Sequence, residues 1–134
     1  MPAKVLDSFA LVAYFRDEPG ADTVESLLVA AARKNTSLYM TDVNYAEVKY
    51  SIIRKDGLIA WTEASKILTG LPIEFLPTSR ALADDAADLK ARHRLSVADA
   101  FAAALARSKK ADLVTGDPEF KPLEKEIKIH WLVK

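Results

Sequence analysis

Short apolar runs alternate along this chain with longer amphipathic or alanine-rich segments, and this alternation limits the possible folds more than any other feature. The short runs suit buried strands, and the longer segments carry apolar residues at helical spacing. Strands and helices in alternation are typical of an α/β domain with a parallel sheet. The pattern predicts strands at 3–6, 37–40, 72–76, 112–115 and 127–133, and helices at 9–16, 21–33, 42–55, 58–68, 79–92 and 97–108.

The size and composition fit one globular domain, and we expect residues 1–134 to form it. Half of the residues are apolar, which is enough for a core at this length. The 19 Lys and Arg residues balance 19 Asp and Glu residues, so the net charge indicates no general affinity for nucleic acid or for an anionic membrane. The absence of cysteine excludes disulfides and thiolate chemistry. Neither a signal peptide nor a membrane span is recognisable, so we expect a cytoplasmic protein.

Two aspartates follow predicted strands, and parallel sheets bind ligands beyond the carboxyl ends of their strands. Asp7 comes directly after the first predicted strand, and Asp117 follows the fourth by two residues. Each also has an ordinary structural explanation, because Asp7 can cap the next helix and Asp117 can belong to the turn Gly116-Asp117-Pro118. Taken alone, either residue fits that structural role more often than a functional one.

Glu47 lies on the predicted helix 42–55, beside Val43 and Tyr50 at the margin of the apolar face. A glutamate in such a place either belongs to a site or packs its stem while its carboxylate reaches water. Asn44 precedes it by three residues and is therefore its neighbour on the helix surface. Both interpretations of Glu47 stay open at this point.

Asp99 is the most informative of the acids. Residues 97–106 consist of nine apolar residues and this one carboxylate. A helix that is apolar all round should be buried, and burying an unpaired carboxylate is costly. Ser96 and Asp99 stand at capping-box spacing, so Ser96 supports this end of the helix and Asp99 can act as a cap, as a ligand or as both. The alanines around Asp99 leave room for a ligand beside it.

The four acids together favour a metal site, because carboxylates packed together raise one another's pKa unless a cation neutralises them. Ligation by oxygen alone suits Mg²⁺ or Mn²⁺, whereas zinc prefers His or Cys. Neither His93, which lies between two arginines, nor His130, within the last predicted strand, is placed to add a ligand. One or two divalent ions could activate water and stabilise an in-line displacement at phosphorus.

Four segments that contain these acids resemble the motifs of PIN-domain nucleases, and particularly the ribonuclease toxins of toxin–antitoxin pairs, the VapC-like group. The resemblance covers the whole chain. No single motif is specific, but four of them in the family's order and in a chain of the family's length are highly specific. The motifs are Val5-Leu6-Asp7-Ser8, Asn44-Tyr45-Ala46-Glu47, Leu95-Ser96-Val97-Ala98-Asp99-Ala100-Phe101 and Val114-Thr115-Gly116-Asp117-Pro118-Glu119-Phe120.

The resemblance implies a fold, an activity and a set of partners. The implied fold is a three-layer α/β/α sandwich around a central, mainly parallel sheet of four to five strands. The implied activity is endonucleolytic cleavage of RNA that depends on Mg²⁺ or Mn²⁺. The implied partners are a second copy of the chain, in a homodimer, and a cognate antitoxin that inserts a segment near the active site.

The resemblance also implies roles for single residues. By motif position, Thr115 would place a hydroxyl near metal-bound water, and Ser8 and Asn44 would support the metal ligands. Many members carry Ser or Asn two residues after the first Asp, where this chain has Phe9, and some tolerate an apolar residue there. Glu119 is a fifth acid, which would orient a ligand or begin a surface turn. The residues that would bind metal directly or through water, and so act in catalysis, are Asp7, Glu47, Asp99 and Asp117.

Two other functions remain to be distinguished from this one. In a phosphotransfer domain Asp7 would accept a phosphoryl group, but such enzymes usually place a second Asp where this chain has Phe9. In a catalytically silent PIN-like binding module the acids are usually lost, and here all four are present. Comparing RNA cleavage by the wild type with that of Asp7→Asn and Asp99→Asn proteins separates catalysis from binding.

Overall fold

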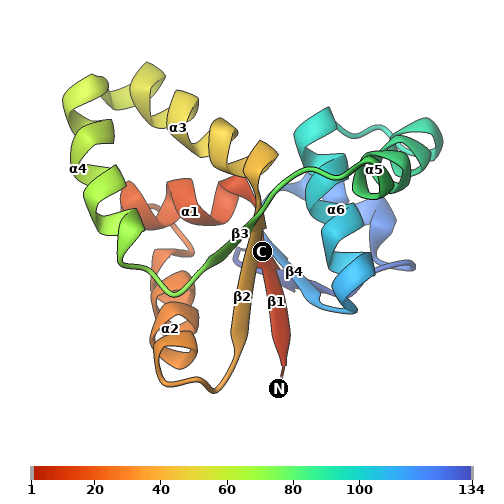
Figure 1. Ribbon diagram of the computed structural model, residues 1–134, viewed down its shortest axis with the longest axis horizontal. Helices are drawn as coiled ribbons and strands as arrows, with labels where there is room; N and C mark the ends of the chain where they lie inside the picture. Colours follow the sequence, from red (N-terminus) through yellow and green to blue (C-terminus); the bar gives the residue numbers. More distant parts are fainter. Residues whose placement is uncertain (1, 134) are drawn as a thin grey trace.

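The computed structural model describes residues 2–133 and contains a five-stranded sheet with helices on both faces (Figure 1). The strands lie in the order β3-β2-β1-β4-β5, and all neighbouring pairs are parallel. The predicted three-layer α/β/α sandwich with a parallel sheet is therefore confirmed. The strands are β1 (Ala3–Leu6), β2 (Ser37–Thr41), β3 (Glu74–Leu76), β4 (Asp112–Thr115) and β5 (Ile129–Trp131).

Within residues 2–133, six α-helices cover the sheet, four on one face and two on the other. Figure 1 shows α1 to α4 to the left of the sheet and α5 and α6 to its right. The helices are α1 (Ser8–Phe15), α2 (Ala21–Ala32), α3 (Asp42–Asp56), α4 (Leu58–Thr69), α5 (Arg80–Arg92) and α6 (Val97–Lys109), and η1 (Pro118–Leu123) is a short 3₁₀ helix. None of the helices within residues 2–133 is long and apolar enough to cross a membrane.

Consecutive strand residues point to opposite faces of the sheet, so the central strands supply both cores. Val5 and Leu113 belong to the core beneath α5 and α6, whereas Leu6 and Val114 belong to the core beneath α1 to α4. The alanines of α6 from Ala100 onward are almost fully buried, and their small size lets the helix lie close to β1 and β4. A helix that looks apolar all round is buried, as predicted.

The structure differs from the sequence prediction mainly near prolines. The third strand begins at Glu74 instead of residue 72, because Pro72 has no N–H for a ladder and Ile73 N donates to Leu71 O within a turn. The predicted strand 127–133 is ladder-paired over Ile129–Trp131 only, and Ile127 N is bonded instead to Leu123 O. The 3₁₀ helix that starts at Pro118 was not predicted.

Candidate metal centre

The strand order places the acids at one point of the sheet edge. Going outward from β1, the chain runs to β2 and β3 on one side and to β4 and β5 on the other. The crevice at the carboxyl ends of β1 and β4 is the place where open α/β sheets bind ligands. Asp7 follows β1 and caps α1, and Asp117 follows β4 and caps the 3₁₀ helix. Both residues therefore lie at that crevice while also serving as caps.

Asp7 is held rigidly inside the protein. Its side chain is 1% exposed. Its Oδ1 accepts a hydrogen bond from the Ala10 backbone N–H at 3.0 Å, and its Oδ2 accepts one from Thr115 Oγ1 at 2.5 Å. The same Thr115 oxygen accepts a bond from the Asp117 backbone N–H at 3.0 Å. The buried hydroxyl of Thr115 thus joins the two aspartates that follow β1 and β4.

Glu47 enters the crevice from α3, and neighbouring hydroxyls hold both of its oxygens. Its Oε1 accepts a short hydrogen bond from Ser8 Oγ, across from α1. Its Oε2 accepts a weaker bond from the Tyr50 hydroxyl at 3.3 Å, one turn further along α3. Ser8 and Tyr50 therefore fix the direction of this carboxylate.

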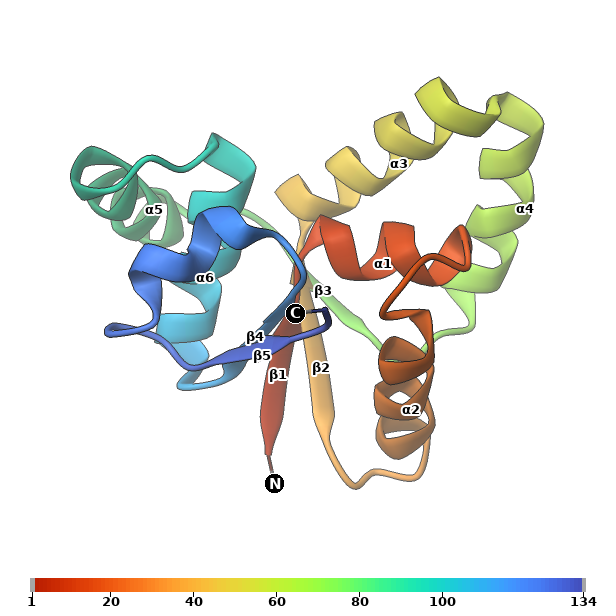
Figure 2. The same ribbon diagram turned by 180° about the vertical axis from the view of Figure 1, so that it is seen from behind.

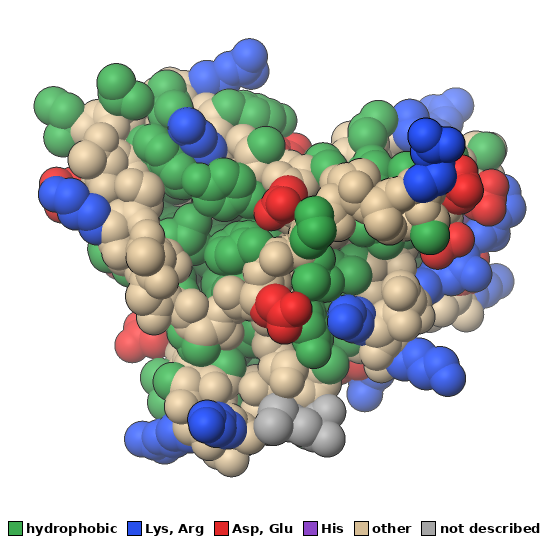
Figure 3. Space-filling model, in the orientation of Figure 1, with side chains coloured by type: hydrophobic (Ala, Val, Ile, Leu, Met, Phe, Trp, Pro, Cys, Tyr) green, Lys and Arg blue, Asp and Glu red, His purple; other side chains and the backbone are tan. Residues whose placement is uncertain are grey.

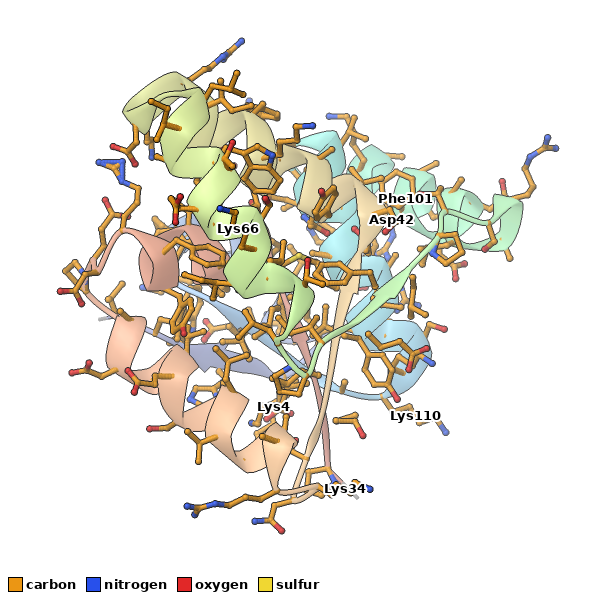
Figure 4. All side chains as sticks on the ribbon, turned by 60° about the vertical axis from the view of Figure 1, so that its left-hand side comes forward. Lys4, Lys34, Asp42, Lys66, Phe101 and Lys110 are labelled. Carbon is orange, nitrogen blue, oxygen red and sulfur yellow. The ribbon has the colours of Figure 1, made fainter. Side chains whose placement is uncertain are left out.

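Asn44 joins α3 to the start of α6, which carries Asp99. Asn44 is completely buried, and its side-chain amide donates to the Ala98 carbonyl at 3.1 Å. Its Oδ1 accepts a hydrogen bond from Thr41 Oγ1 at 2.5 Å, and Thr41 also caps α3. Figure 4 labels Asp42 of α3 and Phe101 of α6 in the region where these two helices approach each other. The amide of Asn44 thus sets the distance between the helices of Glu47 and Asp99.

The tightest group of acids consists of Asp99, Asp117 and Glu119. One carboxylate oxygen from each of them lies within 4.8 Å of the others. Asp99 is buried on the first turn of α6, whose N-cap is Ser96, and the Ser96 Oγ accepts the Asp99 backbone N–H at 3.1 Å. Asp117 Oδ1 accepts the Glu119 backbone N–H at 2.9 Å, which brings Glu119 back toward the crevice. Glu119 therefore does not only begin a turn, because its carboxylate lies beside those of Asp99 and Asp117.

All five acids line one cleft of about 320 Å³. Sequence reasoning missed three further polar residues of this cleft, Glu18, Ser51 and Lys55. Ser51 and Lys55 follow Glu47 at intervals of four residues, and this spacing on one helix face is a signal that could have identified them. Glu18 follows α1 in a turn and gives no such signal. Lys55 is the only basic residue among the described residues that line the cleft.

Burial is the largest cause of the raised pKa values of two of these acids, and the charges of the neighbouring acids add to its effect. Burial raises the pKa of Asp7 to about 8, against the opposing effect of its hydrogen bonds from Thr115 and Ala10. Burial and the nearby charges of Asp117 and Glu47 raise the pKa of Asp99 to about 7. Both carboxylates therefore hold protons far more strongly than an exposed aspartate does.

The donor set fits a hard divalent cation. Every candidate ligand is a carboxylate oxygen, which suits Mg²⁺ or Mn²⁺ and gives zinc none of the nitrogen or sulfur ligands it prefers. His93 bonds to Glu126, and His130 lies against Lys4, so neither histidine belongs to this group. A cation among these acids would stabilise their charged forms and so lower the pKa values that burial and the neighbouring charges raise.

A parallel sheet with carboxylates gathered at its switch point defines an α/β protein with an acidic site at the sheet edge. The model of the PIN domain family matches residues 4–126 of this chain. The chain therefore belongs to the PIN domain family, as the sequence motifs predicted. No curated protein sequence matches the chain significantly.

Solved structures of VapC proteins have the same fold. VapBC2 from Rickettsia felis, bound to a DNA fragment from its promoter, matches with a TM-score of 0.76 and 18% identity over 96% of this chain and 97% of that one. VapC20 from Mycobacterium tuberculosis, described as a toxin that cleaves the sarcin-ricin loop, matches with a TM-score of 0.72 and 18% identity over 89% and 93%. VapBC-1 from nontypeable Haemophilus influenzae matches with a TM-score of 0.72 and 18% identity over 98% and 99%.

Proposed function

We propose that this protein is an endoribonuclease that depends on Mg²⁺ or Mn²⁺ and hydrolyses RNA phosphodiester bonds with a metal-activated water. The observation that carries the proposal is the convergence of Asp7, Glu47, Asp99, Asp117 and Glu119 on one cleft. Membership of the PIN domain family and the description of VapC20 as a toxin that cleaves the sarcin-ricin loop support RNA as the substrate.

In this proposal, some residues of the cleft would bind the metal and others would position the metal ligands. Asp99, Asp117 and Glu119 form the compact group that would hold a cation, with Asp7 and Glu47 as ligands directly or through water. When bound, the cation would polarise the phosphate and lower the pKa of an attacking water. Thr115 holds Asp7 in place through its hydroxyl. Lys55 is the only basic side chain among the described residues that line the cleft, and it would attract the phosphates of the RNA backbone.

The contacts of Asp7 favour this function over phosphotransfer. A phosphoryl acceptor needs a carboxylate oxygen that is free to attack phosphorus. Asp7 is buried, and its two oxygens accept hydrogen bonds from Ala10 N and Thr115 Oγ1. We therefore assign Asp7 to positioning and metal ligation, and expect no covalent phospho-Asp7 after incubation with small phosphodonors.

Removal of divalent metal should abolish RNA cleavage. The purified protein should cut RNA in Mg²⁺ or Mn²⁺, lose this activity in EDTA, and regain it when either ion is added in excess. Without a bound cation the acids of the cleft repel one another and also repel the negatively charged RNA. Gel analysis of end-labelled RNA measures the cut. An RNA that is cleaved equally well in EDTA and in Mg²⁺ would contradict the proposed mechanism.

We also propose that a protein antitoxin and a second copy of this chain bind to the molecule. In Figure 3 apolar side chains gather over α3 and α4 at the upper left. Leu58, Ile59 and Ile67 of α4 are 65%, 83% and 51% exposed, and exposed apolar surface of this kind marks interaction sites. Structures with the same fold include a toxin-antitoxin complex from Klebsiella pneumoniae and VapBC-5 from Mycobacterium tuberculosis, a member of the VapBC family of toxin-antitoxin systems.

Replacing Ile59 with Asp should weaken a partner's binding to this apolar surface without changing the fold. Co-purification with the product of an adjacent antitoxin gene measures the complex, and sedimentation of the isolated chain measures the dimer. Lys66→Asp on the same helix is the control, because its side chain is also exposed but polar. If neither assembly responds to Ile59→Asp, α4 is not the partner surface.

A further inference from the structure

The segment Gly116–Pro118 separates the acidic cleft from a second, apolar cavity. Asp117 lines the acidic cleft, whereas its two neighbours in sequence line the other side. This second cavity measures about 600 Å³, within the range of small-molecule sites. The residues that line it are Gly116, Pro118, Lys121, Trp131 and Val133.

The lining combines an aromatic side chain with a cation. Trp131 is half-buried, and its Nε1 donates to Glu124 Oε2 at 2.9 Å, so the polar edge of the indole is already bonded. Lys121 is exposed and forms no ion pair with any residue that the structure describes. Aromatic faces beside free cations are how proteins bind single-stranded nucleic acid, since the ring stacks on a base and the cation pairs with a phosphate.

The acidic cleft and the apolar cavity lie close together, on either side of Gly116–Pro118. Trp131 is paired in register with Thr115, so it lies about 4.8 Å away on the next strand. Thr115 in turn bonds to Asp7 in the acidic cleft. Gly116 packs against Phe9, and a Cβ at Gly116 would lie only 2.3 Å from the Phe9 ring. Figure 2 shows β5 at the edge of the sheet, with the segment between β4 and β5 passing over α6.

We propose that this cavity binds the base of a nucleotide next to the phosphate that is cut. The base stacks on Trp131, and Lys121 pairs with a phosphate of the same strand. This inference rests on the proposed ribonuclease function and defines its substrate as single-stranded RNA, because a base within a duplex is not free to leave its stack. The cavity lies next to the acidic cleft, with only Gly116–Pro118 between them, and this proximity favours a nucleotide over a protein side chain as the occupant.

The first test compares two lysines of the same segment. The probe is a short fluorescein-labelled oligoribonucleotide centred on a site that the wild type cuts, bound to the Asp99→Asn protein in Mg²⁺. Lys121→Gln should weaken binding about three- to tenfold. The salt dependence of the affinity should also show that about one counterion fewer is released on binding. Lys125→Gln is the matched control, because Lys125 is also exposed but does not line the cavity. Its binding should equal that of Asp99→Asn alone.

The second test reads stacking directly through the fluorescence of Trp131. In an Asp99→Asn, Trp61→Phe protein Trp131 is the only tryptophan, since the chain contains two. The oligoribonucleotide should quench its emission, and an abasic nucleotide at one position beside the cut should remove the quenching and weaken binding about tenfold. Trp131→Leu should weaken binding of the intact oligoribonucleotide by a similar factor and make the abasic substitution neutral.

The outcomes separate this inference from the function on which it rests. If the wild type cuts no RNA in either metal, the proposed function fails and the inference fails with it. If the wild type cuts RNA but Lys121→Gln equals Lys125→Gln and no abasic position matters, the inference alone is wrong. If Trp131 emission responds only to a protein partner and never to the oligoribonucleotide, the cavity is a protein-binding surface and the inference is likewise overturned.

Discussion

Replacing Asp99 with Asn should reduce RNA cleavage at least about 100-fold while stabilising the metal-free fold. Loss of a residue that only supports a metal ligand already costs 10- to 100-fold, and Asp99 belongs to the compact group itself. Burial and the charge of Asp117 raise the pKa of Asp99 to about 7 in the folded protein, so both disfavour its ionised form. A neutral amide removes that repulsion, and we expect a gain of about 2 kcal/mol at pH 8.

Single-turnover cleavage in Mg²⁺ and urea unfolding in EDTA measure the two effects. Asp85→Asn is the control, because Asp85 is a helical aspartate on the exposed side of α5. It should change cleavage less than twofold and stability by less than about 0.5 kcal/mol. An Asp99→Asn protein that cleaves like the wild type would remove Asp99 from the catalytic site, and one that is destabilised would show that its charge does not oppose folding.

The metal-free protein should become less stable as the pH rises from 5 to 8, and Mg²⁺ should reverse this loss. Burial raises the pKa of folded Asp7 to about 8 and that of Asp99 to about 7, whereas an unfolded aspartate titrates near 3.9. The folded state therefore binds more protons than the unfolded state in this range. The stabilising effect of these protons is complete below about pH 4 and is lost as the pH rises through about 7 and 8.

Urea unfolding at pH 5 and pH 8, each in EDTA and in Mg²⁺, gives this dependence. Saturation at about 100 times the dissociation constant of the metal should add about 2.7 kcal/mol at pH 8 and much less at pH 5, where protons compete for the ligands. An Asp7→Asn, Asp99→Asn protein should show neither effect and serves as the control. The opposite slope in the wild type, with stability rising from pH 5 to 8 in EDTA, would mean that burial does not raise the pKa of Asp7 and Asp99 in the folded protein.

Local sequence signals predicted most of the fold. The strand at Ala3–Leu6 and the one at Asp112–Thr115 have the predicted bounds, and every predicted helix is present. The 3₁₀ helix was missed because Pro118 and Pro122 interrupt a region with little helical periodicity. The order of the five strands depends on pairings between distant segments, which no local pattern contains. The parallel direction of the strands could be predicted, because helices connect consecutive strands.

The candidate site was predictable only in part, for the same reason. Asp7 and Asp117 could be placed because strand ends are visible in the sequence. The proximity of Glu119 to Asp99 could not, since it depends on the turn that Asp117 caps through the Glu119 N–H. The direction of Glu47 depends on Ser8, 39 residues away along the chain. The metal-ligand roles themselves remain predictions that the variants above test.

The bond between Thr115 and Asp7 joins residues 108 positions apart. During synthesis the chain leaves the ribosome from its N-terminus, so Asp7, Glu47 and Asp99 emerge before the strand that carries Thr115 and before Asp117 and Glu119. A nascent chain that lacks β4 has only part of its acids and no hydroxyl to fix Asp7. The acidic cleft in which we propose that RNA is cut is therefore complete only after β4 and the segment that carries Asp117 and Glu119 have been synthesised.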